Sequence, residues 1–222
     1  MSRIVQPSGT RGSLKWIQHF VNRDNRTLDA AILAQLPGAN EIAWKSPLVS
    51  DGYAEYRDGD FLGVLNLSHL APALEGFWPK RGPQWDALAF SERGDVLLVE
   101  AKAHIPELHS PGSAASPASL NRIKAALAEA ASQFGAPADT LWHGEFYQLA
   151  NRLAHLAWLR KHGVPAWLVL VNFTGDSDIG GPKTPDEWEQ AYHGAYAALG
   201  IASDAPLLAR VLHIYLDVAR LA

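Results

Sequence analysis

Two short apolar runs separated by a polar turn form the clearest pattern in the chain. The first run is residues 85–90 (WDALAF), the turn is residues 91–95 (SERGD), and the second run is residues 96–102 (VLLVEAK). The second run opens with four consecutive apolar residues, which is typical of a strand covered on both faces. The pattern therefore predicts a β-hairpin whose second strand lies in the middle of an α/β domain.

Three charged side chains interrupt this apolar pattern at one end of the predicted hairpin. Asp86 lies near the start of the first strand, and Glu100 and Lys102 end the second. Side chains alternate between the two faces of a strand, so Glu100 and Lys102 share a face, and the hairpin would bring Asp86 beside Glu100. Buried charges are costly unless they are paired or bound to a metal. The pattern favours a site for a hard divalent cation with an amine beside it; the alternative is a salt-bridged hairpin without a catalytic role.

Helical periodicity predicts two N-terminal helices, the first capped by Ser13 and the second by Thr27. Residues 1–12 are rich in Ser, Gly and Arg and are expected to form a loose arm. We interpret residues 1–52 as an N-terminal helical cap on an α/β core formed by residues 53–222, in one compact domain. Further helices are predicted at residues 53–67, 120–134, 141–162 and 184–199, and further strands at residues 166–173 and 209–217.

Composition places the chain among globular proteins and excludes some kinds of site. Of its 222 residues, 48% are hydrophobic and 19% are charged, which is enough apolar material for one sizeable core. The absence of cysteine excludes disulfides and cysteine–zinc sites. The first twenty residues lack the apolar segment of a secretory signal, and no apolar stretch is long enough to cross a bilayer. We therefore expect a cytoplasmic protein with no membrane partner.

The hairpin sequence resembles the PD-(D/E)XK nuclease superfamily, whose members have the restriction-endonuclease-like fold. Pro83 and Asp86 correspond to the P-D half of the motif, with two extra residues between them, and Glu100-Ala101-Lys102 corresponds to the E-x-K half. The resemblance covers mainly residues 83–102, with looser support to about residue 173. It implies an α/β fold with an αβββαβ core, to which the N-terminal helices would be additions.

The resemblance also implies a metal-dependent nuclease that hydrolyses phosphodiester bonds, with DNA favoured over RNA. Asp86, Glu100 and the carbonyl oxygen of Ala101 would hold Mg²⁺ or Mn²⁺, since hard oxygen ligands favour these ions over zinc. Lys102 would orient or deprotonate the attacking water. A net charge of −4 does not identify a nucleic-acid partner by itself, but it is compatible with a local basic groove.

Two further residues are assigned to the active site by this resemblance. Glu55, in the predicted helix of residues 53–67, is the candidate for the helix acid that many members direct at the metal. Its competitors are Asp51, Asp58, Asp60 and Glu75. Gln148 resembles the glutamine that several branches carry on the helix after the E-x-K strand; those branches often have Tyr four residues later, where this chain has Arg152. An ordinary solvent-exposed helix face is the alternative for both positions.

Basic residues near these positions are candidates for contacts with a phosphate backbone, although any one such residue is more often an ordinary surface charge. The candidates are Lys80, Arg81, Arg122, Lys124 and Arg152. His104, Glu107 and His109 have ligand-like side chains, but Pro106 and the lack of helical spacing make zinc an unfavoured interpretation.

Two other functions are compatible with the same residues. The first is a catalytically inactive nuclease-fold protein that binds nucleic acid or a protein partner. The second is a metal-dependent hydrolase with a non-nucleic substrate. A homodimer is compatible with the nuclease hypothesis because two copies often cooperate in double-strand cutting.

Overall fold

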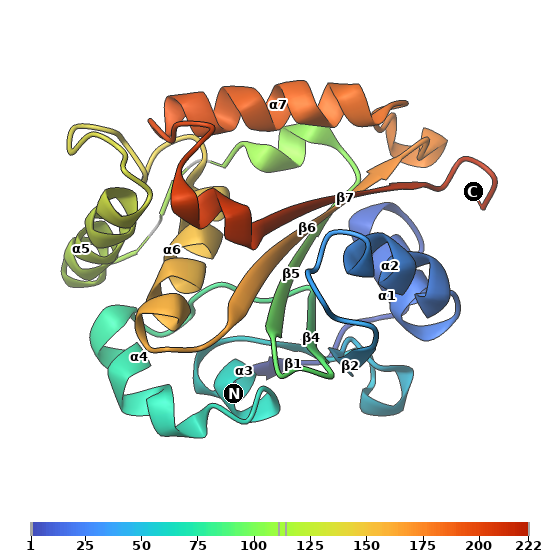
Figure 1. Ribbon diagram of the computed structural model, residues 1–222, viewed down its shortest axis with the longest axis horizontal. Coiled ribbons are helices and arrows are strands. Elements are labelled where there is room, and N and C mark those ends of the chain that lie inside the picture. The colour runs from blue at the N-terminus through green and yellow to red at the C-terminus, as the bar shows by residue number, and fades with distance from the viewer. Residues whose placement is uncertain (1, 111, 114, 222) are drawn as a thin grey trace.

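A five-stranded mixed sheet forms the centre of the computed structural model, which describes residues 2–110, 112–113 and 115–221 (Figure 1). Its strands, in spatial order, are β2 (Ile42–Ser46), β4 (Ala87–Ser91), β5 (Val96–Lys102), β6 (Ala166–Thr174) and β7 (Val211–Asp217). Strand β4 pairs antiparallel with both β2 and β5, whereas β6 pairs parallel with both β5 and β7. The predicted α/β class is confirmed.

The two apolar runs that dominate the sequence form the middle of this sheet. Every residue of β5 and every residue of β6 is buried, because both strands have neighbours on each side and helices on both faces. Strand β5 has the bounds expected from the sequence, and β6 extends one residue beyond its expected end. The first hairpin strand begins at Ala87 rather than at residue 85, and the last strand begins at Val211 rather than at residue 209.

Two helices from the start of the chain cover one face of the sheet (Figure 1). They are α1 (Gly12–Asn22) and α2 (Asn25–Leu33), and their buried side chains pack with Leu97 and Val99 of β5. The expected N-terminal cap does lie on the core, but its capping residues were predicted wrongly. Ser13 lies inside α1, and Thr27 lies inside α2, where its hydroxyl donates to the carboxylate of Asp24, the residue preceding the helix.

The opposite face carries the larger helical layer. Its helices are α3 (Asp58–Val64), α4 (Ala71–Phe77), α5 (Pro117–Gln133), α6 (Tyr147–Lys161) and α7 (Pro185–Ala198), with a small two-stranded sheet of β1 (Arg3–Ile4) and β3 (Glu55–Tyr56). Short 3₁₀ turns occur at Val49–Asp51, Ser68–Leu70, Ile105–Leu108, Ser177–Ile179 and Pro206–Arg210. Leu88 and Leu98 of the central hairpin point into this layer, so residues of the same parity farther along β5 face it as well.

Three expectations fail, two of them because a strand pairing between distant residues overrides the local pattern. Residues 1–12 are not simply a loose arm, since Arg3 and Ile4 pair with Tyr56 and Glu55. That pairing makes Glu55–Tyr56 a strand, so the helix expected at residues 53–67 is reduced to α3. The helix expected from residue 141 begins at Tyr147, after a series of turns that include Pro137 and Gly144.

Strand β2 adds a further role for the first 52 residues. It hydrogen-bonds to β4 and forms one edge of the central sheet. The N-terminal segment therefore supplies an edge strand of the core in addition to the two helices of the cap. Among the described helices, none combines the length and apolar character needed to cross a membrane.

Candidate active site

The hairpin brings Asp86 and Glu100 side by side at one edge of the sheet. Ala87 pairs with Val99 and Leu88 with Leu98, so extending this antiparallel register by one residue places Asp86 opposite Glu100. The Oδ2 atom of Asp86 accepts a hydrogen bond from the backbone N–H of Ala101 at 2.7 Å. Because side chains opposite each other in an antiparallel pair lie on one face, both carboxylates point toward the layer that contains α6.

Glu100 is buried between two cations. Its exposed fraction is 6% and that of Lys102 is 5%. The Nζ atom of Lys102 lies 3.1 Å from Oε1 of Glu100, and Nε of Arg152 lies 2.6 Å from Oε2. Burial alone would raise the pKa of Glu100, but the charges of Arg152 and Lys102 outweigh it and hold that pKa below its ordinary value. Glu100 is therefore ionised at neutral pH.

Arg152 is a structural partner of this carboxylate. Besides Glu100, its guanidinium donates to Oδ1 of Asn151 at 3.0 Å and to the carbonyl oxygen of Gln84 at 2.8 Å, and it stacks over the Trp85 ring. Each of the three guanidinium nitrogens thus has a protein partner. The expectation that Arg152 holds a nucleic-acid phosphate is replaced by a role in the acidic cluster, because a buried Glu100 needs a counter-charge from the facing helix.

Glu55 reaches the same place from strand β3 and not from a helix. Its Oε2 atom accepts hydrogen bonds from the side-chain amides of Gln6, at 2.9 Å, and Gln84. Burial raises the pKa of Glu55, with a smaller contribution from the nearby charge of Glu100. The competing acids lie elsewhere: Asp51 pairs with Arg3, and Asp58, Asp60 and Glu75 surround a different hollow.

The surroundings of Asp86 disfavour the ionised form of its carboxyl group. Burial, followed by the charges of Glu100 and Glu55, raises the pKa of Asp86 well above its ordinary value. The hydrogen bond from Ala101 and the charge of Arg152 oppose this shift without cancelling it. Three neighbouring carboxylates thus share two cationic partners, which leaves an excess of negative charge that favours either a proton or a bound cation.

These side chains line one open cavity of about 370 Å³. It contains all five residues assigned to catalysis from the sequence, and the backbone of Ala101. Its lining residues are Ser13, Glu55, Gln84, Asp86, Glu100, Ala101, Lys102, Glu107, His109, Gln148 and Arg152. Gln148, at the exposed start of α6, reaches the cavity as the resemblance implied.

Four lining residues were not assigned to the site from the sequence. Glu107 accepts hydrogen bonds from the backbone N–H of Ala103 at 3.1 Å and from the Ser13 hydroxyl at 3.3 Å. His109 is fixed by Glu145, whose Oε1 lies 2.7 Å from its Nδ1. Gln84 could have been found from its position two residues before Asp86, on the same side of an extended chain. Ser13 could not, because only the packing of α1 brings it here.

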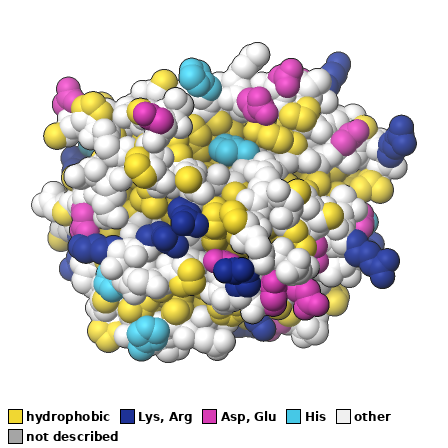
Figure 2. Space-filling model, in the orientation of Figure 1, with side chains coloured by type: hydrophobic (Ala, Val, Ile, Leu, Met, Phe, Trp, Pro, Cys, Tyr) yellow, Lys and Arg dark blue, Asp and Glu magenta, His cyan; other side chains and the backbone are white. Residues whose placement is uncertain are grey.

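Most of the basic residues expected to contact phosphate lie outside this cavity. Lys80 and Arg81 line two neighbouring hollows, Arg122 donates to the carbonyl oxygen of Glu75 at 3.1 Å, and Lys124 is exposed on α5. On the face seen in Figure 2, Lys and Arg side chains are dispersed among acidic and apolar ones and do not form a single stripe.

The donor set fits a divalent cation that keeps much of its water. Within residues 2–110, 112–113 and 115–221, no three His, Asp or Glu side chains form a ready metal cage. Mg²⁺, however, is commonly held by one or two carboxylates and several waters. Asp86 uses only Oδ2 in its bond to Ala101, and Oε1 of Glu100 is bonded to Lys102, which a bound ion would have to displace. The carboxylates of Asp86 and Glu100 and the carbonyl oxygen of Ala101 would hold such an ion.

Comparison of the chain with protein-family models, with curated proteins and with solved structures finds no match. The functional argument therefore rests on the residues and geometry of the cavity.

The raised pKa of Asp86 predicts a pH-dependent stability change in the variant Asp86→Asn. The folded wild type holds this proton more tightly than the unfolded chain, so wild-type stability falls as pH rises from about 4 through the raised pKa. The asparagine variant lacks this loss and should melt higher at pH 7–8, by about 2–4 °C for each kcal/mol gained. Calorimetry in chelator across pH 3.5–8 would measure the difference.

The exposed Asp139→Asn substitution is the matched control, because it removes a carboxylate without altering the cluster. Because the pKa of Glu100 is lowered, both proteins lose stability when Glu100 is protonated at low pH. This loss is common to wild type and Asp86→Asn, so it cancels when their melting temperatures are subtracted. A difference in melting temperature between wild type and Asp86→Asn that is the same at every pH would contradict the electrostatic interpretation.

Proposed function

We propose that the chain is a Mg²⁺- or Mn²⁺-dependent nuclease of the PD-(D/E)XK type that hydrolyses phosphodiester bonds, in DNA rather than RNA. One observation carries the proposal: Asp86, Glu100, Lys102, Glu55 and Gln148, selected by their resemblance to one motif, all line one cavity although they come from four separate segments. If the E-x-K sequence were accidental, Glu55 and Gln148 would have no reason to line the same cavity.

The order of elements supports the same proposal. If β3, α3, α4 and α5 are treated as insertions, the elements α2, β2, β4, β5, α6 and β6 have the αβββαβ order that the resemblance implies, with the antiparallel strands first and the parallel strand after the helix. Strand β2 supplies the first core strand, which the sequence pattern left unassigned. A restriction-endonuclease-like core is thus the finer description that we propose for this α/β sheet.

Each side chain has a role that follows from its contacts. A bound divalent ion would polarise a phosphodiester oxygen and lower the pKa of a coordinated water. Lys102, held by Glu100 inside the cavity, places its ammonium where it can orient the attacking water or a phosphate oxygen. Gln148, exposed at the rim, can donate to a phosphate oxygen. Arg152 positions Glu100 and does not need to touch the substrate.

A catalytically inactive protein with the same architecture is the second candidate. The observation that favours it is that both oxygens of Glu100 already bond to cationic side chains, as in a purely structural network. A metal-dependent hydrolase with a non-nucleic substrate is the third candidate, since the cavity itself does not select a nucleotide.

Cleavage assays separate these candidates. Purified protein should cut single-stranded or plasmid DNA when Mg²⁺ or Mn²⁺ is present and lose this activity in chelator; an RNA of the same sequence should be cut more slowly. Asp86→Asn and Glu100→Gln should abolish cleavage, and Lys102→Ala should slow it by about 10²-fold or more, as for the loss of a general acid–base group.

The surface pair formed by Glu129 and Lys161 provides matched controls, because its atoms lie 2.6 Å apart but both side chains are about half exposed. Glu129→Gln and Lys161→Ala should retain wild-type rates. Wild-type rates in the Glu100 or Asp86 variant would place the chemistry elsewhere. No cleavage of any nucleic acid by the folded, metal-loaded wild type would favour one of the two other candidates.

Metal binding should also stabilise the folded protein, since the crowded carboxylates of the cavity exist only in the native state. At free metal of about 100 times its Kd the gain should be about 2.7 kcal/mol. For a domain of this size that gain corresponds to an upward shift of several degrees in Tm. Asp86→Ala should lose most of the shift and Glu129→Gln none of it, as measured by calorimetry with Mn²⁺. An unchanged Tm for the wild type, together with no heat of binding, would show that the cavity does not bind Mn²⁺ and would contradict the metal-dependent mechanism.

A further inference from the structure

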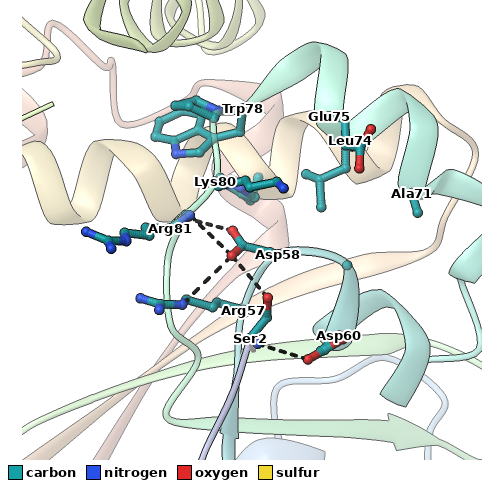
Figure 3. Close-up of a pocket in the computed structure, with 14 residues that line it drawn as sticks. Ser2, Arg57, Asp58, Asp60, Ala71, Leu74, Glu75, Trp78, Lys80 and Arg81 are labelled. Atoms are coloured by element: carbon teal, nitrogen blue, oxygen red, sulfur yellow. Dashed lines mark hydrogen bonds and ion pairs between the residues drawn. The ribbon is translucent and has the colours of Figure 1, made fainter. Parts of the chain in front are cut away.

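A second hollow, of about 470 Å³, lies beside the candidate active site (Figure 3). It is bounded by the start of α3, by α4, by the loop that follows α4 and by α6. The residues that matter to the argument are Arg57, Asp58, Trp78, Lys80, Arg81 and His155. None of the five residues assigned to catalysis lines it.

Three chain segments run directly from the candidate active site into this hollow. On each segment, residues two or three positions apart line different cavities: Glu55 of β3 and Arg57 after it, Gln84 and Gly82 before β4, and Arg152 and His155 on α6. The three-residue step on the helix is a rise of about 4.5 Å, and two extended residues span about 7 Å at most. Since stacked nucleotides of one DNA strand rise about 3.4 Å each, these separations between lining residues correspond to one or two nucleotides.

The carboxylates in the hollow are engaged by protein donors. Asp58 accepts hydrogen bonds from the Ser2 hydroxyl at 3.2 Å, from the backbone N–H of Arg81 at 3.2 Å and from that of Gly82 at 2.9 Å. Asp60 accepts from the backbone N–H of Ser2 at 3.1 Å. These bonds fix the loop, including Arg81 at a φ of 68°, a conformation that a non-glycine residue holds only when its surroundings impose it.

The cations around the hollow are less well satisfied than its acids. Arg57 has its Nε buried without a hydrogen-bond partner among the described residues, 3.8 Å from Asp58. Within the part of the chain that the structure describes, Lys80 and Arg81 make no side-chain hydrogen bond or ion pair. Glu75 is the remaining acid, and it is exposed on α4. In Figure 3 the Lys80 and Arg57 side chains project from opposite sides of Asp58. The free donors are thus cationic, which suits an anionic ligand.

One wall of the hollow is apolar. Trp78 and Leu74 are buried there, and His155 lies against the Trp78 ring with a centroid separation of 4.8 Å. Burial lowers the pKa of His155 to about 3, so this side chain is neutral and adds no charge to the wall. An anionic group that also carries a flat or apolar part would use both the cations and this wall.

We propose that this hollow, the flanking-nucleotide pocket, binds the nucleotide one or two positions from the scissile phosphate. Arg57, Lys80 and Arg81 contact its phosphate, and Trp78 and Leu74 contact its base. A base inside the pocket is not paired, so the preferred substrate is single-stranded DNA or an unpaired end. This inference rests on the proposed nuclease function, and it deepens that function by naming the form of the substrate.

Binding measured without metal tests the pocket separately from catalysis. The probe is a fluorescently labelled single-stranded hexathymidylate in chelator, followed by anisotropy, with a blunt duplex of equal length for comparison. The single strand should bind at least tenfold more tightly than the duplex. The double variant Arg57→Gln/Lys80→Gln should weaken single-strand binding at least tenfold, whereas Arg23→Gln/Arg26→Gln, an equal loss of charge at exposed positions in or next to the N-terminal helices on the other face of the sheet, should change it less than threefold.

Glycine variants test whether the hollow itself is occupied. Gly59 lines the pocket and an added Cβ there would meet open space, so Gly59→Phe introduces a bulky group without removing a charge. Gly76, on α4, is equally open but does not line the pocket, which makes Gly76→Phe the matched control. Gly59→Phe should weaken hexathymidylate binding at least tenfold and Gly76→Phe less than threefold, with both variants retaining the wild-type circular dichroism spectrum.

The outcomes are distinguishable from those of the cleavage assay. Equal effects of the two phenylalanine variants, or tighter binding of the duplex, would overturn the pocket even if the protein cuts DNA. Selective weakening by Arg57→Gln/Lys80→Gln and Gly59→Phe would support the pocket even if no cleavage is found, in which case only the nuclease proposal would fail.

Discussion

A carboxylate at the buried end of a central strand stays ionised only if cations are brought to it, and this requirement organises the structure around Glu100. Lys102 comes from the same strand, but Arg152 comes from α6, so the ion pair joins the central sheet to the helix that covers it. Removing one partner of such a network leaves a buried charge uncompensated, which typically costs about 3–5 kcal/mol. The same guanidinium also holds the carbonyl oxygen of Gln84, and it thereby fixes the chain just before Asp86.

The hairpin, the central strands and the positions of their charged residues could be predicted from the sequence because their signals are local. Continuous apolar runs mark β5 and β6, and the alternation of side chains along a strand places Glu100 with Lys102 and opposite Asp86. The capping box at Thr184 likewise marks the start of α7, since all of its hydrogen bonds lie within four residues.

The remaining features depend on contacts between segments far apart in the chain. Glu55 was assigned to a helix, and only its pairing with Ile4, some fifty residues away in sequence, makes it part of a strand. Arg152 looked like a surface contact for phosphate, because one sequence gives no sign that its helix is buried along nearly its whole length. The proximity of the two cavities, and the part of Arg57 in the second, follow from the packing of β3 against the loop before β4.

The formal charge of the candidate active site depends on whether Asp86 is protonated and on whether a divalent cation is bound. Three carboxylates, those of Glu55, Asp86 and Glu100, face the two cations Lys102 and Arg152. Protonation of Asp86, which the raised pKa favours, makes this group formally neutral and so reduces the cost of burying it without a metal. With Asp86 ionised and a divalent cation present, the group would carry one positive charge, which matches the single negative charge of a phosphodiester. The cluster is therefore neutral when Asp86 is protonated, and it would be complementary to its proposed substrate when Asp86 is ionised and a divalent cation is bound.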